Sequence, residues 1–281
     1  MPGALTLAQG GTVADLYVDP KDDWGVIHAT HELQADIRRV TGRMPVLPQS
    51  PNLQQRDAIL LGTIGRSRLI DRLIRDHVID VSPIRGQWES TLTQVVDHPL
   101  PGVARALVIA GSDPRGTIYG IYDLSARIGV TPWYWWADAN PEPRKTLSLN
   151  IADYTSQPPS VKFRGIFIND EDWGLQPWAA KTLEPETGDI GPKTYAKVFE
   201  LLLRLKANFI WPAMHPSTKA FYHYPGNVTV AGDYQIVIGS SHAEPMLRNN
   251  VGEWNEKTMG AFNYITNKQK EDEKLQIQGM G

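Results

Sequence analysis

Three short segments of the sequence place polar and aromatic side chains directly after apolar runs. They read NDEDW at 169–173, WPAMH at 211–215 and SSHAE at 240–244. Because the preceding apolar runs have the length of buried strands, each segment falls at the C-terminal end of a predicted strand. Enzymes built on parallel strands assemble their sites at that end from several successive strands. The pattern therefore predicts one site to which all three segments contribute.

The first segment carries three consecutive carboxylates, Asp170, Glu171 and Asp172. Crowding of like charge produces a general acid, and ionised carboxylates bind sugar hydroxyls, so the spacing leaves both roles open. In an extended backbone alternate side chains share a side, which predicts Asp170 and Asp172 on one side and Glu171 on the other. An acidic loop that caps a helix near Trp173 is an equally good interpretation of these residues.

Histidine follows two successive predicted strands, as His215 and His242. A protonated imidazole binds a substrate carboxylate, and a neutral one donates an N–H group to a hydroxyl, so the repeated placement favours a functional site. Further polar residues extend the third segment, namely Glu244, Arg248, Asn249 and Asn250. The planar guanidinium of Arg248 suits a uronate carboxylate, although a surface ion pair with Glu244 explains it as well.

Other motifs are weaker. His28 and His31 lack the glutamate placement of a metalloprotease motif, so we interpret them as exposed helix residues, and nothing in the sequence supports metal catalysis. The run GTIG at 62–65 lacks the ending of a phosphate loop and is interpreted as a turn. The run WYWW at 133–136 fits an interdomain contact better than a sugar platform. The sequon at 227–229 is expected to stay unmodified if its loop packs in the site.

The elements that position these residues fall into two regions, divided at the polar and proline-rich run SQPPS at 156–160. In the first region, apolar periodicity predicts strands at 13–18, 58–61 and 106–110, and helices at 26–40, 69–78 and from 118 onward. Strands mixed with helices in this way indicate an α/β sandwich, in which helices cover one sheet.

The second region alternates apolar strands with helices: a strand at 163–168, a helix at 194–206, and strands at 208–211 and 236–239. This order predicts a parallel sheet, either doubly wound or part of a (β/α)8 barrel, and the polar segments at the strand ends favour the barrel. No GxGxxG motif supports dinucleotide binding. A whole barrel needs about 200–250 residues, but 121 residues follow Ser160. We therefore expect about three of the eight units, a truncated C-terminus and a disordered tail at 268–281.

Composition excludes several classes of function. The chain has 281 residues, 41% of them hydrophobic and 21% charged, and a net charge of −3. Without a long basic run, binding to nucleic acid or to an anionic membrane is a poor explanation. The sequence shows neither a membrane-length apolar run nor a signal peptide at its start. The absence of cysteine excludes disulfides, thiolate nucleophiles and cysteine-ligated zinc.

The longest of these motifs resemble one known family. The run RGIFINDEDWGLQPWAAK at 164–181, with EPETGDIG at 184–191, resembles the opening of the catalytic barrel in glycoside hydrolase family 115. Residues 207–215 and 238–250 resemble later parts of that barrel. Upstream, residues 111–122 and the run at 133–136 are similar to the family's N-terminal domain, which itself resembles the second domain of β-hexosaminidases. The resemblance extends from about residue 12 to residue 267.

The resemblance implies a xylan α-1,2-glucuronidase, which removes glucuronic acid or its 4-O-methyl ether from xylan side branches with inversion. It implies a β-hexosaminidase domain-2-like domain at 1–155, a partial TIM barrel at 160–267, and one catalytic carboxylate beyond residue 281. Carried over by position, Asp170 and Glu171 are the catalytic residues. The expected substrate-binding residues are Asp172, Trp211, His215, His242, Glu244, Arg248, Asn249 and Asn250.

The expected partner is glucuronoxylan or its oligosaccharides, with no nucleic acid, membrane, metal or other cofactor. The resemblance further implies an extracellular location, and it leaves a homodimer open for the full-length protein. The alternative is a noncatalytic carbohydrate-binding protein or an inactive truncated fragment. In that case the unpaired edge of a three-stranded sheet predicts aggregation.

Overall fold

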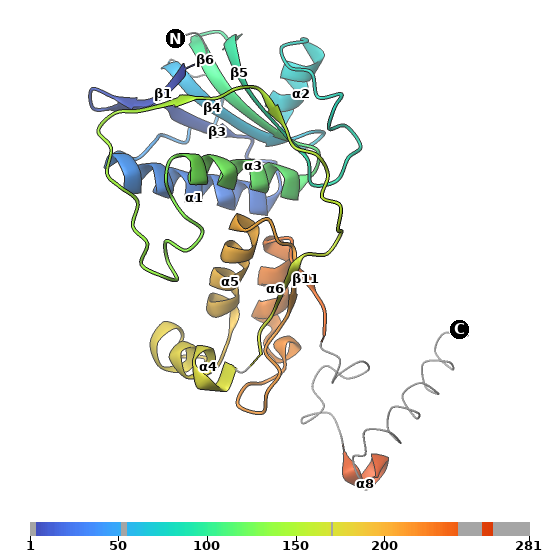
Figure 1. Cartoon of the computed structure of the whole chain (residues 1–281). Coiled ribbons are helices and arrows are strands. Elements are labelled where there is room, and N and C mark those ends of the chain that lie inside the picture. The colour runs from blue at the N-terminus through green and yellow to red at the C-terminus, as the bar shows by residue number, and fades with distance from the viewer. Residues whose placement is uncertain (1–3, 52–54, 170, 241–254, 261–281) are drawn as a thin grey trace. The chain divides into compact units, whose positions relative to one another are not determined.

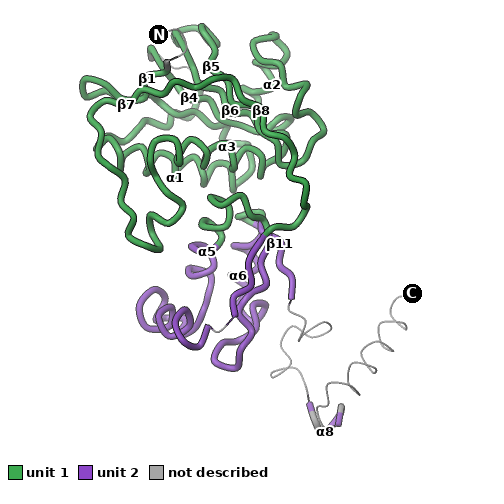
Figure 2. Tube along the Cα trace, in the orientation of Figure 1, with its two compact units in different colours: residues 1–164, 199–208, 233–235 green, residues 165–198, 209–232, 236–281 purple. Residues whose placement is uncertain are grey.

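The computed structural model describes residues 4–51, 55–169, 171–240 and 255–260 (Figure 1). Contacts divide the chain into two compact units, which we describe separately (Figure 2). The first comprises residues 1–164, 199–208 and 233–235, and the second comprises 165–198, 209–232 and 236–281. Both mix helices with strands, which confirms the predicted α/β class. Among the described helices, none has the length and apolar character required to cross a membrane.

A five-stranded sheet forms the centre of the first unit. Its order is β3 (Asp15–Val18), β4 (Gln55–Thr63), β6 (Val103–Gly111), β5 (Thr91–Leu100) and β8 (Tyr154–Thr155). Strands β3, β4 and β6 are parallel, whereas β5 is antiparallel to both β6 and β8. The apolar runs predicted at 58–61 and 106–110 are fully buried in β4 and β6, as expected for central strands covered on both faces.

A second, antiparallel sheet completes the strands of this unit. Its order is β2 (Thr12–Val13), β1 (Ala4–Gln9) and β7 (Leu147–Asn150). The strand predicted at 13–18 is therefore two strands, because residues 12–13 pair with β1 while residues 15–18 pair with β4. The sequence prediction missed β1 and β7 of this sheet, and also β5 and β8 of the central sheet.

Three helices cover the central sheet. Helices α1 (Trp24–Thr41) and α3 (Pro114–Arg127) lie together on one face of the sheet (Figure 1). Helix α2 (Arg68–Arg75) packs through Leu69, Ile70 and Leu73 onto alternate residues of the strands, including Leu60 and Val108. Each helix begins at a capping residue whose side chain accepts a hydrogen bond from a backbone N–H group of the first turn. The caps are Asp23 for α1, Ser67 for α2 and Asp113 for α3.

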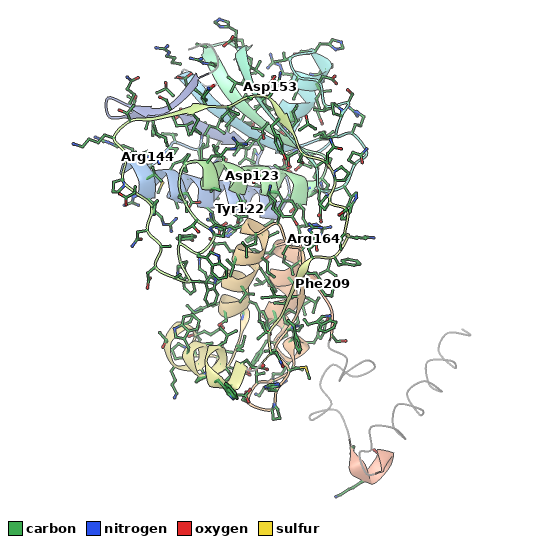
Figure 3. The ribbon with its side chains drawn as sticks, in the orientation of Figure 1. Tyr122, Asp123, Arg144, Asp153, Arg164 and Phe209 are labelled. Atoms are coloured by element: carbon green, nitrogen blue, oxygen red, sulfur yellow. The ribbon has the colours of Figure 1, made fainter. Side chains whose placement is uncertain are left out.

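Two buried charge clusters hold the first unit together. Glu89 accepts hydrogen bonds from Arg115 (2.6 Å), from Asn208 (2.7 Å) and from Arg164, which is labelled in Figure 3. Arg164 and Asn208 directly precede two strands of the second unit in sequence. The other cluster joins Arg204 to Asp36 and Glu200, at 2.9 Å each. Burial of charge is tolerated here because the partners are of opposite sign and hydrogen-bonded.

The second unit contains a three-stranded parallel sheet, which confirms the predicted parallel pairing. Its order is β11 (Val237–Ile238), β10 (Phe209–Trp211) and β9 (Gly165–Phe167). The helices of this part of the chain are η1 (Glu171–Trp173), α4 (Leu175–Trp178), η2 (Ala179–Leu183), α5 (Pro192–Arg204), η3 (Phe221–His223), α6 (Pro225–Asp233) and α8 (Glu256–Met259). Helix α5 lies close to the predicted range 194–206, whereas α6 was not predicted.

Close packing between β9 and β10 requires glycine at position 165. A Cβ atom there would lie 1.7 Å from the carbonyl oxygen of Phe209. At the end of β11, Gly239 leaves space for an aromatic ring, since a Cβ atom there would lie 2.8 Å from Trp211 Nε1. These two glycines fix how closely the strands and the Trp211 ring approach one another.

Candidate active site

The C-terminal ends of β9 and β10 bring three of the predicted site residues together. Glu171 and Asp172 lie in η1, shortly after β9, and His215 lies in the loop that follows β10. One ligand atom from each of these side chains lies within 4.8 Å of the other two. Parallel strands present their C-terminal ends at a common edge, so the first two polar segments meet there.

Glu171 is the most buried of the three, with 2% of its surface exposed. Its Oε1 atom accepts hydrogen bonds from the backbone N–H groups of Met214, at 2.6 Å, and His215, at 2.7 Å. Its Oε2 atom has no hydrogen-bond partner within the described residues, and it lies 3.7 Å from His215 Nδ1. One oxygen of this carboxyl group is therefore fixed, and the other is buried with its hydrogen-bonding capacity unused.

Asp172 and His215 form a polar pair beside Glu171. His215 Nδ1 lies 2.8 Å from Asp172 Oδ1, and the hydroxyl of Ser217 donates to the same oxygen at 3.1 Å. The hydrogen bond from His215 lowers the pKa of Asp172, and the Ser217 hydroxyl adds to this effect. Asp172 is thus an anion that fixes the orientation of the imidazole ring.

The expected alternation of side chains after β9 is wrong for Glu171 and Asp172. An extended segment would direct them to opposite sides, but both approach His215. The reason is that residues 171–173 form a 3-10 turn instead of continuing the strand. Successive side chains in such a turn are separated by about 120°, which allows neighbours to reach one ligand.

Two tryptophans lie near these residues in sequence. Trp211 ends β10, and its ring packs against Phe167 with centroids 5.4 Å apart and planes at 74°. Trp173 ends η1 and is 86% exposed, so its indole ring is available to a ligand. An exposed aromatic face next to carboxylates is suited to the apolar face of a sugar.

Buried carboxylates that the sequence analysis did not single out support the loop after β10. Asp189 accepts hydrogen bonds from the Thr218 hydroxyl (2.7 Å), the Lys219 backbone (2.9 Å) and the Tyr224 phenol (3.0 Å). Burial and this hydrogen bond raise the pKa of Tyr224 to about 12. Glu184 accepts from the backbone N–H groups of Gly191 and Thr194. Glu184 lies in the run EPETGDIG at 184–191, which the sequence analysis used only for the family resemblance.

Six predicted site residues cannot be placed. They lie outside the described residues and are Asp170, His242, Glu244, Arg248, Asn249 and Asn250. Ser217 was not predicted, because a single serine in a loop carries no sequence signal. The structure therefore gives the geometry of Glu171, Asp172, Trp211 and His215.

Three of the weaker sequence motifs lie away from the Glu171, Asp172 and His215 cluster in sequence, and each makes its own contacts. His28 is only partly exposed, because it stacks on Trp24 at 4.6 Å and lies 2.9 Å from the phenol of Tyr234, which corrects its interpretation as an exposed residue. Tyr134, from the aromatic run at 133–136, donates to Glu200 at 2.8 Å. Asn227 of the sequon is fully buried in α6 and donates to a backbone carbonyl at 2.9 Å.

Comparison with known proteins agrees with the resemblance seen in the sequence. Residues 156–276 match the family model described as Glycosyl hydrolase family 115. The solved structure of BtGH115A, a 4-O-methyl-α-glucuronidase with specificity for decorated arabinogalactans, is 38% identical with a TM-score of 0.74. The alignment covers 92% of this chain and 32% of BtGH115A, so the chain spans about a third of that enzyme's length.

Two other solved structures are more distant. CpGH84D is 11% identical with a TM-score of 0.49, over 85% of this chain and 34% of that one. A GH138 enzyme targeting pectin rhamnogalacturonan II is 12% identical with a TM-score of 0.42, over 80% of this chain and 24% of that one. No curated protein matches the sequence. The family-model match and the similarity to BtGH115A support glycoside hydrolase family 115 for this chain.

Proposed function

We propose that this chain forms part of the active site of a glucuronidase-type glycoside hydrolase, which removes glucuronic acid or its 4-O-methyl ether from the side branches of xylan. The family-model match supports hydrolysis of a glycosidic bond. The similarity to BtGH115A supports a uronic acid as the sugar removed. We propose xylan as the polymer because the sequence resemblance implies it. Decorated arabinogalactan, for which BtGH115A has specificity, is the second polymer to test.

One observation carries the proposal. A nearly fully buried carboxyl group, Glu171, is fixed through one oxygen by two backbone amides, and its other oxygen has no hydrogen-bond partner among the described residues. Burying such an oxygen without a partner is costly, so purely structural carboxylates seldom show this arrangement. Its position after β9, beside Asp172 and His215, is the position of a site in a parallel α/β fold.

We assign roles to the residues as follows. Asp170 and Glu171 are the proposed catalytic carboxylates, and Glu171 presents Oε2 to the occupant of the site. The remaining candidates bind the uronic acid and the neighbouring sugar: Asp172, Trp211, His215, His242, Glu244, Arg248, Asn249 and Asn250. His215, held by Asp172, directs its remaining ring nitrogen away from that carboxylate.

The proposed reaction inverts the anomeric carbon. In inverting enzymes one carboxylic acid protonates the leaving oxygen while a second carboxylate activates a water on the opposite face, about 6.5–9.5 Å away. Glu171 and Asp172 approach the same imidazole and are too close together to serve as that pair. We therefore propose that Asp170 or Glu171 supplies one carboxyl group of the pair, and that the other lies on a later strand of a barrel, beyond residue 281.

This proposal includes a domain layout. Residues 1–155 are proposed to be a β-hexosaminidase domain-2-like domain and residues 160–267 the first units of a TIM barrel. The parallel order β9, β10, β11 with intervening helices α5 and α6 supports the barrel. Because xylan is outside cells, we propose an extracellular location, and a homodimer of the full-length protein remains a proposal to be tested by its mass in solution.

The test uses the full-length protein from its source. Proton NMR would follow its reaction with 4-O-methylglucuronoxylan, with a decorated arabinogalactan and with unbranched xylan as the control. We expect free uronic acid from a branched polymer, appearing first as the β-anomer, and no uronic acid from unbranched xylan. Failure to release uronic acid from either branched polymer would refute the proposal, and first appearance of the α-anomer would refute inversion.

A second function, carbohydrate binding without catalysis, is favoured by the exposed indole of Trp173. It predicts that glucuronoxylan oligosaccharides bind the chain and that no uronic acid is released. Isothermal titration with these oligosaccharides, together with the NMR reaction, separates the two functions. Binding that is unchanged in Trp173→Ala would remove the support for this second function.

A further inference from the structure

We propose that Glu171, Asp172 and His215 bind a divalent transition-metal cation, and that this cation holds the carboxylate of the uronic acid. The second clause rests on the proposed function, whereas the first is independent of it. On this account Glu171 contributes to the reaction as a ligand of the cation that touches the substrate.

The first argument is the environment of Glu171 Oε2. The residue is 2% exposed, and this oxygen has no hydrogen-bond partner among the described residues. A buried oxygen that lacks a partner costs about 1–3 kcal/mol, and more when the group is charged. Because the neighbouring groups are a carboxylate and an imidazole, a cation between the three satisfies Oε2 without moving Oε1 from its two amides.

The second argument is geometric. His215 Nδ1 lies 2.8 Å from Asp172 Oδ1 and 3.7 Å from Glu171 Oε2. Two ligands each about 2.1 Å from one ion are about 3.0–3.7 Å apart when the angle between them is about 90–125°. These two separations require only small shifts, and the three ligand atoms all lie within 4.8 Å of one another. Asp172 can move to close the site because its side chain is 40% exposed.

The third argument is charge. Among the described residues, His215 is the one basic side chain that forms an ion pair with either Glu171 or Asp172. A uronic acid brings a further negative charge to this edge of the sheet. Like charges at close range are destabilising, so a substrate carboxylate beside these two carboxylates needs a positive group. A divalent cation neutralises the cluster and offers open positions to the substrate.

The ligand set indicates the class of cation. Imidazole nitrogen favours Zn²⁺ and other late transition metals, and carboxylates also accept Mn²⁺. Mg²⁺ and Ca²⁺ prefer oxygen ligands alone. Three protein ligands also leave coordination positions open, as in catalytic rather than structural metal sites. No sequence motif indicated this site, because its ligands come from segments that are 43 positions apart.

The test titrates Mn²⁺ into the chelator-treated chain and follows the free ion by electron paramagnetic resonance. We expect one Mn²⁺ per chain, displaced by Zn²⁺ more effectively than by Mg²⁺. Glu171→Gln and Asp172→Asn should each weaken binding about tenfold or more. Glutamine at 171 keeps a carbonyl oxygen for both backbone amides, and Asp172 is exposed, so both variants should keep the fold, which circular dichroism would verify.

Glu186→Gln is the matched control, since Glu186 is an exposed carboxylate of the same unit that pairs with Lys193. Its Mn²⁺ affinity should equal that of the unaltered chain. Absence of binding, or equal affinity in Glu171→Gln, Asp172→Asn and the control, would overturn the metal site.

The substrate clause is tested on the Mn²⁺-loaded chain. Bound Mn²⁺ should broaden the proton NMR signals of glucuronic acid, most strongly the signal of the hydrogen on the carbon next to the carboxylate. It should broaden the signals of xylose much less. Equal broadening of both sugars would overturn this clause. If Mn²⁺ binds as expected but the full-length protein releases no uronic acid, the proposed function fails and the metal site stands.

Discussion

Replacing Arg204 by alanine should strongly destabilise the first unit, because it removes the buried cation that two buried carboxylates, Asp36 and Glu200, share. The guanidinium lies 2.9 Å from Asp36 and 2.9 Å from Glu200, and the side chains of these three residues are 2%, 0% and 4% exposed. Arg204 also lies over the rings of Tyr122, at 4.6 Å, and Tyr134, at 4.8 Å.

The expected loss in the free energy of unfolding depends on the partners that each carboxylate retains in the variant. Removing one member of a buried ion pair costs about 3–5 kcal/mol, since the remaining charge is uncompensated. Asp36 keeps Arg39 at 2.6 Å and Glu200 keeps the phenol of Tyr134 at 2.8 Å, so the cost is not doubled. We expect a loss of about 3–5 kcal/mol in the free energy of unfolding.

Arg39→Ala is the matched control, because Arg39 pairs with the same Asp36 but its side chain is 37% exposed. Its loss should be about 0–1 kcal/mol. Urea unfolding followed by tryptophan fluorescence and circular dichroism measures both variants by linear extrapolation. The reasoning fails if Arg204→Ala costs no more than Arg39→Ala.

Three further predictions concern single positions. Gly165→Ala should destabilise the second unit by about 1–3 kcal/mol or more, because the new Cβ atom would lie 1.7 Å from the carbonyl oxygen of Phe209. The control is Gly174→Ala, because a Cβ atom at position 174 would have no atom within 4 Å. Equal urea midpoints for the two variants would contradict the prediction. Burial and hydrogen bonding raise the pKa of Tyr224 to about 12, so the stability that this phenol contributes should be lost as the pH rises from about 10 to about 12. Ionisation of Tyr224, measured as the increase in absorbance at 295 nm that is missing in Tyr224→Phe, should occur near pH 12; ionisation near pH 10 would refute this. Asn227 is buried, so it should stay unglycosylated when the protein is produced in a eukaryotic secretory host. The prediction would be contradicted if peptide N-glycosidase lowered the mass of the unaltered protein but not that of Asn227→Gln.

Apolar runs predicted β3, β4 and β6 and the long helices, because burial on both faces of a sheet leaves a continuous signal. Strand β5 was missed, since buried, half-buried and exposed residues are mixed along Thr91–Leu100. Helix α6 was missed, since Pro225–Asp233 contains two glycines and several β-branched residues, which have low helix propensity. The strands β1 and β7 were missed because their pairing joins the two ends of the first unit. Such pairings depend on tertiary contacts that no local window contains.

For the candidate site, the sequence indicated that the first two polar segments follow strands, but not how their side chains are arranged. The 3-10 turn at 171–173 brings Glu171 and Asp172 to the same imidazole, and local alternation cannot predict that turn. Buried charge partners were also beyond sequence analysis. Asp36 and Arg204, for example, are 168 positions apart.

The most direct test of the account compares uronic acid release from 4-O-methylglucuronoxylan by the unaltered full-length protein, by Glu171→Gln and by Glu186→Gln. Because Glu171 is the described carboxylate whose free oxygen faces the proposed site, its amide variant should lose about 10²-fold or more in rate. Glu186 is exposed and paired with Lys193, so its variant should keep the unaltered rate. A Glu171→Gln enzyme that releases uronic acid as fast as the Glu186→Gln enzyme would contradict the central claim.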